Sequence, residues 1–193
     1  LFLGGAYFAY STFGHVQSRV TVWLDPWAYS DTGGYQIVQS IYGLANGGIL
    51  GAGLGQGFPN LVPFASTDFI VSALGEELGV TGIFAILLLY AILVERGLRI
   101  AITCRDGFGQ LLAAGLSITF ALQVFVIVGG VTGLIPLTGL TTPFLSYGGS
   151  SLIANWVILA LLLRISDRSR RPDLSKVSPD DAMTQVVPRV RPV

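Results

Sequence analysis

Charged side chains are scarce in this sequence. Asp, Glu, Lys and Arg make up 11% of its 193 residues, whereas soluble domains carry about 25%. Residues 107–163 contain no Asp, Glu, Lys, Arg or His at all. A soluble domain does not keep so long an uncharged stretch in water, so the sequence indicates an integral membrane protein.

Cysteine and histidine are also nearly absent. The single cysteine, Cys104, has no partner for an internal disulfide. The single histidine, His15, has no second His or Cys at metal-ligand spacing, so we expect no dedicated metal cage. The net charge is zero and gives no indication of nucleic acid as a partner.

Apolar segments long enough to cross a bilayer occur three times. A spanning helix needs about 20 predominantly apolar residues, and residues 68–94, 109–131 and 145–165 qualify. The chain begins without Met in a shorter apolar run, and we expect residues 1–18 to be the end of a truncated transmembrane helix. The predicted fold class is an all-α polytopic membrane protein with three complete transmembrane helices, the end of a fourth and a long extracellular loop.

Arginines follow the first and the third of these segments and predict the orientation. They stand at positions 96, 99 and 105, and again at positions 164, 168, 170 and 171. The positive-inside rule places both clusters in the cytoplasm, and two spans separate them, so the two assignments agree. Residues 19–67 are then an extracellular loop, residues 68–166 hold the three spanning helices, and residues 167–193 form a disordered cytoplasmic tail.

Two connecting segments carry structural signals of their own. Residues 35–45 place apolar side chains at helical spacing, which predicts a short helix in the membrane interface. The glycines of residues 46–57 permit tight turns and a close approach to another group, and are only a weak phosphate signal. Residues 133–149 contain Gly and Pro and predict a buried or re-entrant turn rather than a helix.

Three carboxylates stand at the start of the first predicted spanning helix, where carboxylates are costly. For Asp68 two interpretations stay open. Either Ser66 or Thr67 caps the helix and Asp68 complements its dipole, or Asp68 is a general base at the outer membrane face. Glu76 lies about 80° around the helix from Asp68 and about 12 Å along it, so we expect it to share the cavity of Asp68. Glu77 points the other way and is expected to hold helices together.

The remaining polar candidates each have two interpretations. Arg19 is the only cation on the predicted outer side; it either anchors the truncated helix at the interface or holds a phosphate oxygen. Ser146, Ser150, Ser151 and Asn155 bring polar groups to membrane depth, and Gln123 does the same in the preceding helix. Interhelical hydrogen bonding is the usual explanation for such groups, and a structural role is predicted for Asn155. The alternative is a hydrated cavity lined by them.

Five motifs together resemble one family. They are WLDP (23–26), GYQIVQS (34–40), GGILGAGLG (47–55), TDFIVSALGEELGVTG (67–82) and PFLSYGGSS (143–151). In this order they closely resemble the SEDS family (shape, elongation, division and sporulation), over about residues 15–171. Members have about ten spanning helices, so the chain resembles the last three, the end of the preceding helix and the large extracellular loop.

The resemblance implies a peptidoglycan glycosyltransferase that polymerises lipid II at the outer face of the bacterial cytoplasmic membrane. The aspartate of the family's TDF motif falls on Asp68, which would deprotonate the 4-hydroxyl of the acceptor's GlcNAc. That oxygen attacks the anomeric carbon of the donor's MurNAc, and undecaprenyl pyrophosphate leaves. Arg19 or a loosely held divalent cation (Mg or Mn) would then balance the charge of the leaving group.

The resemblance also implies substrate-binding residues and partners. The residues predicted to bind substrate are Arg19, Glu76, Ser146, Tyr147 and Gly148. The expected partners are undecaprenyl-pyrophosphate-linked glycan, a class B penicillin-binding protein transpeptidase and other membrane proteins of the elongation complex, with no nucleic acid. The chain by itself is expected to be inactive, because the helices that complete the cavity would be absent.

Two departures from the family pattern refine this interpretation. Ala52 stands where many relatives have a basic residue, and Ala65 stands where many have the acidic residue of an LPE sequence. The second departure, with the absence of the KW pair of division paralogues, favours a RodA-type elongation protein of actinobacterial character. The alternatives are an FtsW-type division paralogue, a lipid II flippase that uses Glu76, and a non-catalytic scaffold for a transpeptidase.

Overall fold

The structure, a computed structural model, describes residues 2–170, and the regular elements of that part are all helices. The helices are α1 (Phe2–Thr12), α2 (Gly14–Leu24), α3 (Tyr35–Gly47), the 3-10 turn η1 (Pro59–Leu61), α4 (Ile70–Thr103), α5 (Gly107–Val131) and α6 (Gly149–Arg170), with no strand between residues 2 and 170. In α4, α5 and α6 this part of the chain has three helices long and apolar enough to cross a membrane. The predicted all-α fold with three such helices is therefore confirmed.

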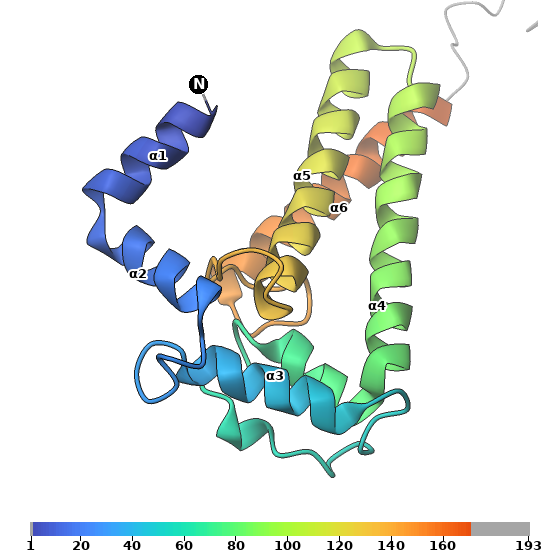
Figure 1. Cartoon of the computed structure of the whole chain (residues 1–193). Helices are drawn as coiled ribbons and strands as arrows, with labels where there is room; N and C mark the ends of the chain where they lie inside the picture. The colour runs from blue at the N-terminus through green and yellow to red at the C-terminus, as the bar shows by residue number, and fades with distance from the viewer. Residues whose placement is uncertain (1, 171–193) are drawn as a thin grey trace, which may run out of the picture.

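The boundaries differ from the predicted ones at both ends. Residues 1–18 were expected to be one helix end, but the chain is broken at Phe13, whose backbone is extended (φ −107°, ψ 110°). Figure 1 shows α1 standing apart from α4, α5 and α6, whereas α2 reaches them and its Val22 packs in one core cluster with Ile127 and Val131 of α5. The last helix extends to Arg170, so the first residues of the predicted tail 167–193 are helical, and the rest of that tail lies outside the described residues.

The predicted helix over 68–94 is not one continuous rod. Helix α4 is interrupted at Gly79, which has a non-helical backbone (φ 70°, ψ −173°). Figure 1 shows the turns before this break lying behind α3, while the rest of α4 runs alongside α5. Asp68, Glu76 and Glu77 all precede Gly79, so the carboxylates stand before the long straight part of α4, residues 80–103.

The segment that follows α3 fills this break with backbone hydrogen bonds. On one side, the amides of Ala52 and Gly53 donate to the carbonyls of Glu76 and Glu77 at 2.9 and 3.0 Å. On the other side, the amides of Val80 and Thr81 donate to the carbonyls of Gly48 and Ile49 at 3.0 and 3.1 Å. The peptide groups that the interrupted helix leaves unpaired are thereby satisfied, as buried backbone requires.

Close approach explains why this segment is rich in glycine. A Cβ on Gly51 would lie 2.2 Å from the carbonyl oxygen of Glu77, and one on Gly79 would lie 2.3 Å from the amide nitrogen of Gly51. Both residues also have positive φ, at 85° and 70°, a backbone that L side chains rarely adopt. The glycines therefore serve the packing of the broken helix, and a phosphate is not needed to explain them.

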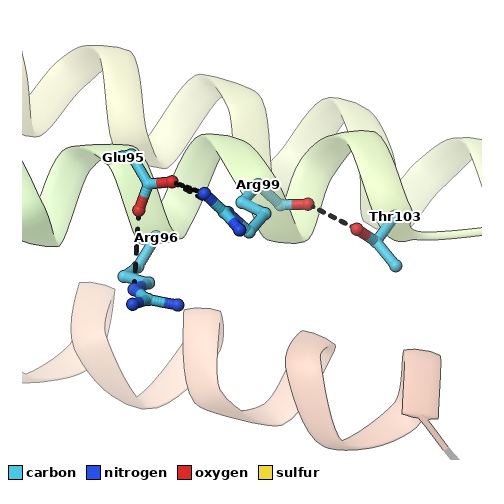
Figure 2. Close-up of polar contacts among 4 residues, drawn as sticks. All are labelled: Glu95, Arg96, Arg99 and Thr103. Atoms are coloured by element: carbon cyan, nitrogen blue, oxygen red, sulfur yellow. Dashed lines mark hydrogen bonds and ion pairs between the residues drawn. The ribbon is translucent and has the colours of Figure 1, made fainter.

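Within residues 2–170, the arginines of both clusters lie toward one end of the helix bundle (Figure 1). Figure 1 shows the connection from α4 to α5 and the end of α6 at one end, and α3 at the other. Figure 2 shows Arg96 and Arg99 beside Glu95. The Arg99 guanidinium donates to Glu95 through Nε at 2.8 Å and also through Nη2, and the Arg96 Nε lies 3.5 Å from the other carboxylate oxygen.

Candidate active site

Asp68 and Arg19 meet at Gly139, although they are far apart in the sequence. A Cβ on Gly139 would lie 3.7 Å from the Oδ2 of Asp68 and 3.8 Å from the Nη2 of Arg19. The two side chains line one pocket of about 360 Å³, together with Val22, Gln36 and other residues. Gly139 has a φ of 70° and no side chain, which leaves this space open between a carboxylate and a guanidinium.

The carboxylate of Asp68 is half-buried, and its oxygens are unpaired within the described residues. Within residues 2–170, no side chain or backbone amide forms a hydrogen bond or an ion pair with it. Arg19 is exposed and donates from Nη1 to the carbonyl oxygen of Leu137 at 2.9 Å, which holds the chain next to Gly139. The lone pairs of Asp68 and the second guanidinium nitrogen of Arg19 therefore remain available to a ligand in the pocket.

The backbone around Asp68 is fixed by its neighbours rather than by a helix cap. Phe69 is 1% exposed and packs in the core with residues of α2, α3 and α5. The expected cap from Ser66 or Thr67 is wrong: α4 begins at Ile70, Phe69 occupies the N-cap position, and no side chain caps the helix. Thr67 instead donates its hydroxyl back to the carbonyl of Phe64 at 3.2 Å.

The turn before α6 holds the segment that carries Asp68. The hydroxyl of Ser146 donates to the carbonyl of Thr67 at 2.5 Å and accepts from the amide of Thr142 at 2.7 Å. The amide of Tyr147 donates to the carbonyl of Ser66 at 2.8 Å. Ser146 is 9% exposed and lies outside the lining of the Asp68 pocket. The structure thus gives Ser146 a positioning role, and its contact with substrate stays a prediction.

Two side chains from the spanning helices in turn hold this loop. The hydroxyl of Tyr90, on α4, donates to the carbonyl of Pro143 at 2.6 Å. The amide of Gln123, on α5, donates to the carbonyl of Thr141 at 3.2 Å. Sequence reasoning did not assign these partners, because the pairings join positions that are 53 and 18 residues apart and no local pattern marks them.

Glu76 does not share the pocket of Asp68, contrary to the prediction. It is 4% exposed, and its Oε1 accepts from the Nδ2 of Asn46 at 3.0 Å. Its other oxygen lies near Gly43, where a Cβ would be 3.6 Å away. The helix turns that carry Glu76 pack against α3, which directs this carboxylate to α3 and away from Asp68.

Glu77 follows Glu76 on the same short helical piece, and a Cβ on Gly57 would lie 3.2 Å from both side chains. Glu77 lines a second pocket, of about 590 Å³, with Phe64, Ala65 and Ser66. It therefore faces the loop that precedes Asp68, whereas the prediction had it face another helix. Phe64 separates the two pockets, since it lines both.

The other predicted site residues do not meet Asp68. Tyr147 is 85% exposed and does not line its pocket, and a Cβ on Gly148 would lie 3.3 Å from Thr141. Asn155 is 2% exposed, but its Nδ2 donates within its own helix, to the carbonyl of Ser151 at 2.9 Å. Its Oδ1 is buried and unpaired among residues 2–170, so the expected bond between helices is not formed there.

Residues 2–170 offer no set of side chains that would hold a metal ion by protein ligands alone. In the described part of the chain, no group of three or more His, Cys, Asp or Glu side chains lies close enough to hold one. The pocket of Asp68 offers a single carboxylate beside a guanidinium. A resident Mg²⁺ site usually adds substrate phosphates and waters to one or two carboxylates.

Comparison with known proteins gives consistent matches along the chain. A family model described as cell cycle protein (FtsW/RodA/SpoVE) matches residues 2–171. The peptidoglycan glycosyltransferase RodA of Mycobacterium tuberculosis is 63% identical over 172 residues, which cover 89% of this chain and 37% of that protein. A probable peptidoglycan glycosyltransferase FtsW of a Geobacter species is 47% identical over 154 residues, which cover 79% of this chain and 42% of that protein.

A solved structure has the same arrangement of helices. It is described as showing structural coordination of polymerization and crosslinking by a peptidoglycan synthase complex, and it matches with a TM-score of 0.71 and 30% identity over 89% of this chain and 47% of that one. The chain thus spans about two fifths of the length of the curated relatives it matches. The higher identity to an actinobacterial RodA than to an FtsW agrees with the branch that the sequence motifs favour.

Proposed function

The chain belongs to the FtsW/RodA/SpoVE family, the SEDS family, and on this premise we propose that the protein is a peptidoglycan glycosyltransferase of cell elongation. It polymerises lipid II at the outer face of the bacterial cytoplasmic membrane. The observation that carries the proposal is the half-buried, unpaired carboxylate of Asp68, which faces the guanidinium of Arg19 across the open space at Gly139. A base beside a cation is the arrangement that this transfer needs.

In the proposed reaction Asp68 is the general base. It takes the proton of the acceptor's 4-hydroxyl while that oxygen attacks the anomeric carbon of the donor. The new C–O bond forms as the bond from the anomeric carbon to the pyrophosphate oxygen breaks, and the leaving group keeps that electron pair. Positioned proton transfer of this kind contributes about 10²–10⁴-fold to a rate, and the absence of an ion pair to Asp68 among residues 2–170 leaves its oxygens free to accept the proton.

Arg19 is proposed to bind the pyrophosphate of the donor. Its Nη1 is committed to the carbonyl of Leu137, and this bond orients the guanidinium so that the remaining donors face the pocket. A planar guanidinium binds phosphate oxygens with two parallel hydrogen bonds. Charge that develops on the leaving group is then stabilised at a fixed position.

A divalent cation, if the reaction uses one, is proposed to arrive with the pyrophosphate. Asp68 is the single carboxylate of the pocket, so most ligands of a Mg or Mn ion would be phosphate oxygens and water. Such an ion would neutralise charge on the leaving group.

The proposed orientation and partners follow from charge and from the relatives. The arginines at one end of the bundle are placed in the cytoplasm, with the C-terminus, and the Asp68 end outside. The partners proposed are lipid II, glycan linked to undecaprenyl pyrophosphate, a class B penicillin-binding protein transpeptidase and other membrane proteins of the elongation complex. The solved structure of a peptidoglycan synthase complex, described as coordinating polymerization with crosslinking, supports a transpeptidase partner.

The test is polymerisation of purified lipid II by the full-length protein and its Asp68→Asn variant. We expect the variant to lose polymerisation, and Asp31→Asn to retain it, since Asp31 is exposed and outside the pocket. Polymerisation by Asp68→Asn at the normal rate would refute the general-base role. Transport of lipid II measured in the same vesicles separates the flippase alternative. That alternative uses Glu76, which precedes the break at Gly79 and so lies outside the long part of α4, residues 80–103.

A further inference from the structure

A third pocket lies at the end of the bundle opposite Asp68. It has a volume of about 800 Å³ and is bounded by the connection from α4 to α5 and by the last turns of α6. Figure 1 shows that these two segments come together at the end away from α3. The proposed glycosyl transfer makes no use of this pocket.

The lining of this pocket combines arginines with apolar side chains. The arginines are Arg105, Arg164, Arg168 and Arg170, and all are exposed. The apolar wall includes Leu112, Ile165 and Phe108, and Phe108 is 73% exposed. A pocket with a basic rim and an apolar wall, at the end of membrane-spanning helices, is suited to an amphipathic anion.

The charge in this pocket is not balanced by neighbouring carboxylates. Two carboxylates line it, Asp106 and Asp167. Asp106 caps α5 by accepting from the amide of Gly109 at 3.2 Å, and Asp167 lies 3.8 Å from Arg164. No carboxylate of residues 2–170 pairs with the other three arginines.

Arginines elsewhere at this end of the bundle differ in this respect. Figure 2 shows that Arg96 and Arg99 are both engaged by Glu95. Neither lines the basic pocket. These two arginines supply a matched comparison, because they have the same charge at the same end of the bundle and lie outside the pocket.

We propose that this pocket binds the headgroup of an anionic phospholipid. The phosphate accepts hydrogen bonds from the guanidinium groups, for which its oxygens are well matched. The acyl chains leave the pocket along Phe108 and Leu112, which continue into the apolar surface of α5. Basic pockets between transmembrane helices are known sites for such headgroups.

The test measures lipid binding by the full-length protein with native mass spectrometry in detergent. The probes are phosphatidylglycerol and phosphatidylcholine at equal concentration, and inorganic phosphate as competitor. We expect phosphatidylglycerol to bind in preference to phosphatidylcholine. Each arginine near an anionic lipid surface contributes about fivefold to binding, so R164Q/R168Q is expected to bind phosphatidylglycerol about 30-fold more weakly.

Two further variants keep the result interpretable. R96Q/R99Q removes the same charge outside the pocket and is expected to bind within about twofold of the unmodified protein. R164K/R168K keeps the charge and is expected to retain most of the binding. Equal binding of the two lipids, an equal loss in both glutamine pairs, or displacement of the lipid by inorganic phosphate at equal concentration would overturn the proposal.

Discussion

Replacing Ser146 with alanine tests how the turn before α6 positions Asp68. The hydroxyl of Ser146 makes two hydrogen bonds, to the carbonyl of Thr67 at 2.5 Å and from the amide of Thr142 at 2.7 Å. Thr67 directly precedes Asp68. The substitution removes both bonds at once and leaves the backbone of the two loops otherwise intact.

The size of the effect follows from burial. Ser146 is 9% exposed and Thr142 is 2% exposed, so water replaces the lost bonds poorly. A buried polar group left without a partner costs about 1–3 kcal/mol, and two groups are affected. We expect Ser146→Ala to lower the free energy of unfolding by about 2–4 kcal/mol. We also expect kcat for polymerisation to fall about 100-fold, since a displacement of about 1 Å at a reacting group costs that much.

The assay compares kcat, KM and thermal unfolding of the full-length protein and its variants. Ser150→Ala is the matched control, because Ser150 is exposed in the first turn of α6 and is expected to leave all three values unchanged. Ser146→Thr keeps a hydroxyl and is expected to recover part of the loss. A rise in KM alone, with unfolding unchanged, would refute the positioning role and restore Ser146 as a substrate-binding residue.

Three further substitutions have defined outcomes. Gly79→Ala is expected to lower the free energy of unfolding by more than about 2 kcal/mol, because its Cβ would lie 2.3 Å from a backbone nitrogen. Gly115→Ala is the control, since a Cβ there has open space around it. Equal free energies of unfolding for the two variants would contradict the account. Arg19→Ala is expected to reduce kcat/KM about 100-fold, and Arg19→Lys about tenfold, since lysine keeps the charge and loses the bidentate geometry. Equal activity of Arg19→Ala and the unmodified protein would exclude the binding of pyrophosphate by Arg19. Glu76→Gln keeps the acceptor for Asn46 and is expected to reduce polymerisation less than about tenfold, whereas a loss like that of Asp68→Asn would show that Glu76 takes part in catalysis.

The sequence predicted the parts of the fold that depend on composition and local pattern. Long apolar segments predicted the three spanning helices, since a bilayer requires about 20 apolar residues whatever the tertiary structure. The structure also has a helix, α3, where residues 35–45 were predicted to form one, and an irregular, partly buried turn over 133–148.

The break in α4 was not predicted, because it depends on a contact distant in sequence. Residues 68–94 have helical composition throughout, and Gly79 alone is an ambiguous signal. The break exists because Gly51 approaches the backbone of α4 and its neighbours form hydrogen bonds with the peptide groups that are freed. The same break directs Glu76 toward α3, which is why a single straight helix gave the wrong neighbour for that carboxylate.

The candidate site was predicted only in part, because some of its residues are brought together by contacts that are distant in sequence. Asp68 and Arg19 were identified by chemistry, as an acid and a cation on one predicted side of the membrane, and the structure brings them to one pocket. Gly139 between them, and the support of the loop by Tyr90 and Gln123, come from tertiary contacts. Hydrogen bonds from side chains to distant carbonyls leave no periodic mark in a sequence.

The most direct test of the central claim is the turnover rate of Asp68→Asn in the full-length protein at saturating lipid II. The amide has nearly the shape of the carboxylate and does not accept the proton, so we predict that lipid II still binds while kcat falls about 10²–10⁴-fold. Turnover within a factor of about two of the unmodified protein, with lipid II bound equally well, would contradict the assignment of Asp68 as the general base.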